Sequence, residues 1–261
     1  EGVVMIDRTK LEPVLIGYQT YFPKHWPHGE DFKWEAVQYF HTHWDIDAAD
    51  FGAMFKEATA KVSGLLDTGY AYPRAMILNF TAADNEATRT MFRRLFDETH
   101  DLSERIKAFQ TSSEVLRTKH NDGSWNNHYQ NTSAISVYLW LQFPDKYYAY
   151  RYAVSHDIAK ELNFDTPPKR DGSVDSLLNS YRLYDELREA LSRDSSITQM
   201  LRHAIENSPA GKYWPDAHWN IATIDLGFYL SRYYLWEQTA AQKESGWFPR
   251  KSDYDPGITT E

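Results

Sequence analysis

Apolar side chains in this chain recur mostly at intervals of three and four residues, the spacing of one face of an α-helix. The clearest face runs through the segment after residue 47 and consists of Phe51, Phe55, Ala58, Val62 and Leu65. Similar faces recur in residues 32–44, 91–96, 102–116, 177–191, 197–205 and 221–238. Helical segments therefore outnumber strand-like ones too heavily for a doubly wound sheet, and the pattern predicts a mainly helical fold.

Two short segments favour strands instead. Residues 75–80 (AMILNF) form a short apolar run, and residues 146–152 (KYYAYRY) alternate so that Tyr148, Tyr150 and Tyr152 share one face. A lone strand leaves its amides unpaired, so we expect the two segments to pair with each other. Residues 134–143 (AISVYLWLQF) fit a strand or a helix, and their length favours the helix. The predicted class is mainly α (α+β), with several helices and a small β element.

Prolines, glycines and clusters of charged residues indicate the boundaries between parts of the fold. The strongest internal break is residues 163–173, which hold two prolines, a glycine and mixed charge. We predict an N-terminal lobe over 1–164 that carries the β element, a helical lobe over 174–245, and a linker-like tail over 246–261. The start through Gly29 reads as a docked arm. Asp47 or Asp50, and later Asp84, are placed to cap the helices that follow them.

Composition excludes several classes of protein. The 261 residues contain no cysteine, so disulfides and thiolate zinc sites are ruled out. No apolar run approaches the roughly 20 residues of a membrane span, and no signal-peptide pattern opens the chain. We therefore expect a cytoplasmic protein without a membrane partner. The net charge of −9 argues against nonspecific coating of DNA, although a local basic patch remains compatible with it.

Sequence signatures of catalysis are missing. The pair Gly211-Lys212 lacks the upstream glycine and the Ser or Thr of a phosphate-binding P-loop. We assign no catalytic residue. The weak candidates for a metal site are His41, His43 and Asp45, whose i,i+2 spacing suits a helix poorly. A metal-dependent hydrolase that uses them is kept as a second alternative.

A polar loop and the tyrosine segment together carry the ingredients of nucleobase recognition. Aromatic rings stack on bases, amides read base edges and cations hold phosphates. The candidate nucleic-acid-binding residues are Trp125, Asn126, Asn127, Tyr129, Tyr148, Tyr150, Arg117, Lys119, Lys146 and Arg151. Arg232 is a further residue that could touch phosphate. The alternative is structural, because tyrosine-rich segments usually pack in cores.

Several segments together resemble the N-terminal region of McrB-like AAA+ proteins, which belong to modification-dependent, 5-methylcytosine-specific type restriction systems. The resemblance spans most of residues 20–236. It is carried by FKWEAVQYFHTHWDIDAADFGAMFKEA, YPRAMILNF, MFRRLFDETHDLSERIKAF, WNNHYQNTSAISVYLWLQFPDKYYAYRY and IATIDLGFYLSRYY.

The resemblance implies a modular parent protein for phage defence. Its N-terminal module would recognise DNA, methylated or not, and a C-terminal AAA+ motor would hydrolyse GTP or ATP with Mg²⁺. A partner nuclease of the McrC type would cut the DNA. The motor signature is missing here, so we expect a fragment without a cofactor of its own. The leading hypothesis is a non-catalytic target-recognition module that binds DNA. The first alternative is a protein-protein interaction or trigger-sensing module of a defence system.

Overall fold

The computed structural model describes residues 5–244, and within this range the chain is helical with no strand. The first half contains α1 (Arg8–His25), the 3₁₀ turn η1 (Trp26–His28), α2 (Phe32–His43), α3 (Phe51–Ala58), the 3₁₀ turn η2 (Ala60–Val62), α4 (Ser63–Leu66), α5 (Pro73–Ala83), α6 (Asn85–Leu95) and α7 (Leu102–His120). The second half contains α8 (Thr132–Gln142), α9 (Tyr152–Glu161), α10 (Val174–Arg193), α11 (Ser195–Glu206), α12 (Asn220–Tyr229), the π-helical turn η3 (Leu230–Tyr234) and α13 (Leu235–Glu244). The mainly α class is confirmed.

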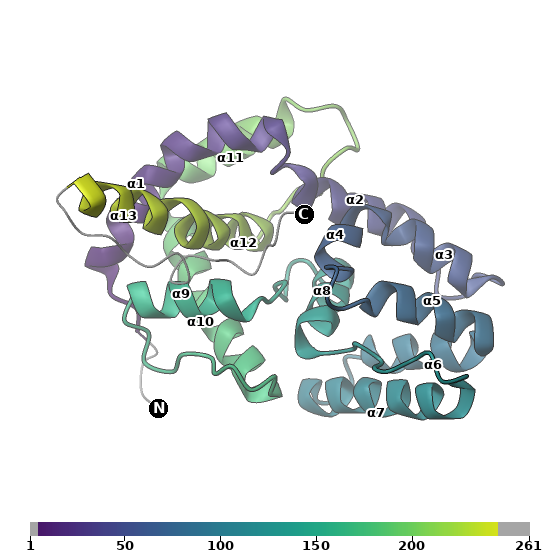
Figure 1. Cartoon of the computed structure of the whole chain (residues 1–261). Helices are drawn as coiled ribbons and strands as arrows, with labels where there is room; N and C mark the ends of the chain where they lie inside the picture. Colours follow the sequence, from purple (N-terminus) through teal and green to yellow (C-terminus); the bar gives the residue numbers. More distant parts are fainter. Residues whose placement is uncertain (1–4, 245–261) are drawn as a thin grey trace.

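The helices form two groups that meet at the centre of the molecule. Figure 1 shows α2 to α8 on one side and α1 with α9 to α13 on the other. The N-terminal helix α1 therefore packs against α11 and α12, far from it in sequence. The division into lobes 1–164 and 174–245 stays a prediction, and the predicted tail 246–261 lies outside the described residues. None of the helices between residues 5 and 244 combines the length with the hydropathy that a transmembrane span requires.

The predicted arm at the start is a regular helix instead. The side chain of Asp7 caps α1 by accepting hydrogen bonds from the amides of Thr9 and Lys10. Pro13 and Pro23 lie inside the helix, and its buried face includes Tyr18 and Phe22. The segment is docked as predicted, since this aromatic face packs against α12, and its burial outweighs the amide donors that the prolines remove.

The strand predicted over 75–80 is wrong, because these residues lie inside α5. Pro73 occupies the first turn of that helix, where its missing N–H costs nothing. A carboxylate oxygen of Asp67 accepts from the amides of Arg74 and Ala75. The helix buries Met76, Ile77 and Phe80, a spacing that a six-residue run is too short to reveal.

The strand predicted over 146–152 is also wrong. Residues 147–151 are irregular and Tyr152 opens α9, so the small β element does not form in the described chain. The amide of Tyr150 donates to the hydroxyl of Ser136 on α8, 2.8 Å away, instead of to a neighbouring strand. Alternation alone misled here, because Tyr147 is buried as well as Tyr148 and Tyr150, so the alternating positions do not separate into a buried face and an exposed face.

Most predicted helices are confirmed. The ambiguous segment 134–143 falls largely in α8, and the predicted caps Asp50 and Asp84 accept from the amides of Ala53 and Ala87. The single helix expected over residues 47–66 is broken into α3, η2 and α4, and the break begins at Thr59.

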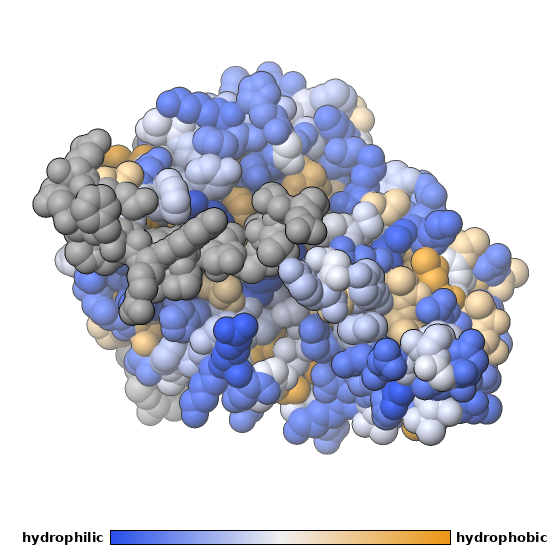
Figure 2. Space-filling view, viewed as in Figure 1, coloured by the Kyte–Doolittle hydropathy of each residue, from blue (hydrophilic) through white to orange (hydrophobic). Residues whose placement is uncertain are grey.

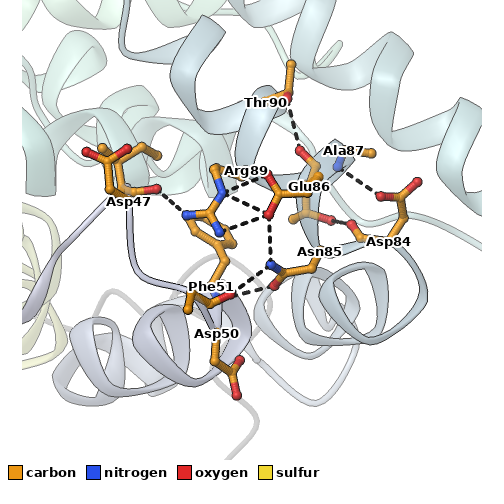
Figure 3. A network of polar contacts seen from close by, with 12 residues as sticks. Asp47, Asp50, Phe51, Asp84, Asn85, Glu86, Ala87, Arg89 and Thr90 are labelled. Atoms are coloured by element: carbon orange, nitrogen blue, oxygen red, sulfur yellow. Dashed lines mark hydrogen bonds and ion pairs between the residues drawn. The ribbon is translucent and has the colours of Figure 1, made fainter.

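A polar junction fixes α3 against α6. Figure 3 shows Asn85 at the centre of it. The side-chain oxygen of Asn85 accepts from the amide of Phe51 at 3.2 Å, and its NH₂ group donates to the carbonyl of Ala49 at 3.2 Å. Arg89 binds Glu86 one turn along the same helix. The two bonds of Asn85 join positions that are distant in sequence and hold α6 against the start of α3.

Aromatic rings build much of the core. Trp44 meets several rings edge to face, and Phe92 and Tyr138 lie 5.3 Å apart by ring centroid. Many aromatic side chains of the chain therefore pack in the core, as the structural alternative for the tyrosine segment predicted.

Candidate functional site

A cavity of about 660 Å³ lies where the two groups of helices meet. We call it the interhelical cavity. Its walls come from α2, η2, α4, α8, α9, α10, α12, η3 and the irregular residues before α9. Its volume falls within the range of about 300–1,000 Å³ typical of small-molecule sites. Figure 2 shows one face of the molecule, on which hydrophilic residues predominate and hydrophobic residues gather in smaller areas.

One wall of the cavity carries a buried ion pair. Lys33 on α2 places its ammonium 2.9 Å from a carboxylate oxygen of Asp225 on α12, and it also binds Glu30. Burial works against the charge of Lys33, but the two carboxylates outweigh it and the pKa is raised. Lys33 is therefore a charged but already neutralised group, and it holds α2 and α12 together.

Arg151 is different, because nothing in the described chain balances its charge. Its half-buried side chain lines the cavity and makes no hydrogen bond or ion pair with the residues that the structure describes. Burial lowers the pKa of the guanidinium without any carboxylate to offset it, yet arginine stays charged in proteins. A desolvated cation without a counter-ion is costly unless an anion binds it.

Aromatic groups complete the walls. Phe32 and Phe228 are half-buried, and Lys33 Nζ lies 4.9 Å and 5.1 Å from the centroids of their rings. Trp140 on α8 is fully buried and lines the cavity, while its Nε1–H finds no acceptor among the described residues. The cavity thus offers flat apolar surface and the guanidinium of Arg151. Asp67 also lines it, with a carboxylate oxygen that accepts from the amides of Arg74 and Ala75.

The sequence-predicted site residues do not converge on one hollow. Arg151 and Arg232 line the interhelical cavity, whereas Asn127 and Tyr129 line a separate hollow of about 570 Å³ beside Tyr70. Lys119 is exposed and borders a third hollow, near Thr111. The predicted common surface for base recognition is therefore not formed.

Tyr148 and Tyr150 require a correction. Both are buried, so neither ring presents a face for stacking on a base. Tyr148 stacks on Tyr184 with ring centroids 5.1 Å apart, and its hydroxyl donates to Asp185 at 2.8 Å. Lys146, at the start of this segment, is exposed and paired with Glu98 at 2.8 Å.

The polar loop before α8 mostly holds itself together. Asn127 accepts from the amide of Tyr129 at 2.7 Å, which supports the positive φ of 59° at Tyr129. Arg117 binds Glu114 and donates to the carbonyl of Trp125 at 2.9 Å. Trp125 is half-buried against Phe80.

The free binding groups of this loop are few. Asn126 and Asn127 are exposed, and Asn127 already spends its side-chain oxygen on the turn. Side chains that were predicted to contact nucleic acid, such as Arg117 and Asn127, therefore bind other groups of the protein instead.

The weak metal candidates are spread apart. A ring nitrogen of His41 lies 2.8 Å from the carbonyl of Leu141, and one of His43 lies 2.8 Å from that of Tyr39. Asp45 accepts from the amide of Asp47. Within the described part of the chain, no group of three or more His, Cys, Asp or Glu residues is placed to hold a metal.

Sequence reasoning missed Lys33, Phe32 and Trp140 as cavity residues. Lys33 did carry a signal, since it lies four residues before Val37 on the apolar face of its helix. Trp140 carried none, because the residues on either side of it, Leu139 and Leu141, are apolar and make it indistinguishable from any other core residue.

No protein-family model matches the chain, and no curated protein or solved structure matches it significantly. The resemblance to McrB-like N-terminal regions therefore stays a prediction.

Proposed function

We propose that this chain is a non-catalytic target-recognition module that binds DNA, modified or unmodified, for a cytoplasmic McrB-like AAA+ restriction motor. The motor, with GTP or ATP and Mg²⁺, and a McrC-like nuclease would act from other polypeptide. The observation that carries the proposal is Arg151, a half-buried guanidinium in the interhelical cavity that no carboxylate of the described chain balances.

Phosphate is the natural partner of such a group. A guanidinium binds a phosphate through two parallel N–H donors, and the gain is larger where water is partly excluded. The cavity also supplies aromatic surface from Phe32 and Phe228 for a base. The combination suits one nucleotide better than it suits a protein side chain or an uncharged ligand.

The acidic net charge sets the expected strength and salt dependence. With a net charge of −9 the chain as a whole repels DNA, so we expect few phosphates to be held. One or two contacts correspond to a slope of about −1 to −2 in a plot of log K against log salt. Binding is therefore expected to be weak at physiological salt and detectable at low salt.

Fluorescence anisotropy with labelled oligonucleotides tests the proposal. Single strands and duplexes, with and without modified cytosine, are titrated at several salt concentrations against the wild type, Arg151→Gln and Arg94→Gln. Arg94 is an exposed arginine on α6, away from the cavity, and serves as the matched control.

We expect Arg151→Gln to weaken binding and to reduce the salt slope by about 1, while Arg94→Gln leaves both unchanged. Circular dichroism checks that each variant is folded. Absence of binding to every DNA at low salt would overturn the proposal, and so would equal affinity of the wild type and Arg151→Gln.

A further inference from the structure

We propose that the interhelical cavity binds one nucleoside phosphate, with the base against the aromatic walls and the phosphate at Arg151. The ligand is either a free nucleotide or a nucleotide turned out of DNA. The inference rests on the proposed function for the second source only, because a free nucleotide needs no DNA binding.

The position of the cavity suits a ligand that joins the two groups of helices. Phe32, Lys33 and Trp140 come from α2 and α8, whereas Tyr184 and Phe228 come from α10 and α12. A molecule held between these walls contacts both groups at once. Binding should therefore stabilise the whole chain against unfolding.

The pairing of the cations that line the cavity indicates that the phosphate would bind at Arg151. Lys33 is neutralised by Asp225 and Glu30, and Lys61 forms an ion pair with Glu35 at 3.4 Å. Arg151 alone among these three cations has no carboxylate partner in the described chain. Arg232 also lines the cavity from the π-helical turn η3, a distortion that is frequent at functional sites.

The apolar walls favour an aromatic ligand over a plain phosphate ester. Phe32 on α2 and Phe228 on α12 both lie close to the ammonium of Lys33, and both are only half-buried. The planar ring of a nucleobase can lie against these side chains, whereas a phosphate ester without a base makes no use of them.

Isothermal titration calorimetry and thermal unfolding of the whole chain test the inference. The probes are AMP, GMP, CMP and UMP, the four corresponding nucleosides, ribose 5-phosphate and inorganic phosphate. At least one nucleotide should bind and raise the midpoint of thermal unfolding. The matching nucleoside and ribose 5-phosphate should each bind about 10- to 100-fold more weakly, since each lacks one of the two recognised groups.

Variants assign the two groups. Arg151→Gln should bring nucleotide affinity down to that of the nucleoside, Arg151→Lys should keep part of the difference, and Arg94→Gln should keep all of it. Phe228→Leu should weaken nucleotide and nucleoside alike. If Arg151→Gln fails to fold, Arg151→Lys and the ligand series still decide the question.

The outcomes separate this inference from the proposed function. Binding of DNA with no binding of any nucleotide, and no effect of Phe228→Leu on DNA affinity, overturns the nucleotide site and leaves the function standing. Nucleotide binding through Arg151 without any DNA binding supports the site and overturns the function. Equal affinity for nucleotides and inorganic phosphate reduces the cavity to a general anion site and overturns the inference.

Discussion

The ammonium nitrogen of Lys33 lies 2.9 Å from a carboxylate oxygen of Asp225, and both side chains are buried. The hydroxyl of Tyr18 donates to the other oxygen of Asp225 at 2.6 Å. Three helices, α1, α2 and α12, are thus joined at one carboxylate near the C-terminal end, and both of its partners come from the N-terminal end of the chain.

Replacing Asp225 by Asn should strongly destabilise the fold. Lys33 would keep only Glu30, and removing one partner of a buried ion pair typically costs about 3–5 kcal/mol. Urea unfolding of Asp225→Asn, Lys33→Met and the double variant measures the coupling, which should make the double variant less damaging than the sum of the two. Lys61→Met, which breaks an ion pair whose lysine is 45% exposed, is the control and should cost at most about 1 kcal/mol. If Asp225→Asn lost less free energy of unfolding than Lys61→Met, the buried ion pair would not stabilise the fold.

Asp216 should make stability depend on pH near neutrality. Burial raises the pKa of this carboxyl to about 7, although Trp34 and the amides of Ile221 and Ala222 donate to it. A folded-state pKa above the unfolded value of about 3.9 means that the native state holds the proton more tightly. The free energy of unfolding therefore falls as pH rises from about 4 to 7 and levels off above.

Comparison with Asp216→Asn isolates this contribution, because the other carboxyl groups cancel. The stability of the wild type minus that of the variant should decline with rising pH by up to ~1.4 kcal/mol per pH unit, and it should be constant above about pH 8. Urea unfolding at pH 5, 6, 7 and 8 provides the values. A difference that stays the same from pH 5 to pH 8 would rule out the raised pKa.

Gly17 should tolerate no side chain. A Cβ atom at this position of α1 would lie 2.1 Å from the hydroxyl oxygen of Tyr229. Gly17→Ala should therefore destabilise by about 1–3 kcal/mol, despite the better helix propensity of alanine. Tyr229→Phe in the same chain removes the obstructing oxygen and should restore part of the loss. Gly64→Ala, with no atom within 4 Å of the new Cβ, should be neutral or stabilising. Thermal unfolding that ranks Gly17→Ala with Gly64→Ala would contradict the steric reason.

Tyr148 should be a structural residue. Its hydroxyl donates to Asp185 and accepts from the side chain of Arg188 at 3.0 Å. Tyr148→Phe leaves both partners short of a bond and should cost about 1–3 kcal/mol in urea unfolding. The opposite pattern, unchanged stability with weaker DNA binding in the anisotropy titration, would restore the stacking role first predicted for this ring.

Local signals made the helices predictable. The stripe of Phe51, Phe55 and Ala58 and the caps at Asp50 and Asp84 act within one or two turns, so the linear sequence contains what forms them. The two strand predictions failed for the opposite reason. Residues 75–80 and 146–152 are too short for local preference to decide, and helices packed around them determined their backbone.

The sequence by itself determined a mainly helical protein, and it indicated Arg151 as one of several candidate phosphate-binding residues. Only the tertiary structure decided that Tyr148 is buried, that Lys33 meets a carboxylate 192 positions away and that Arg151 faces a cavity with no partner in the described chain. The physical reason is that helices form from contacts between near neighbours. A cavity instead forms where segments distant in the chain come together without filling the space between them, so its lining and charge depend on packing that no single segment encodes.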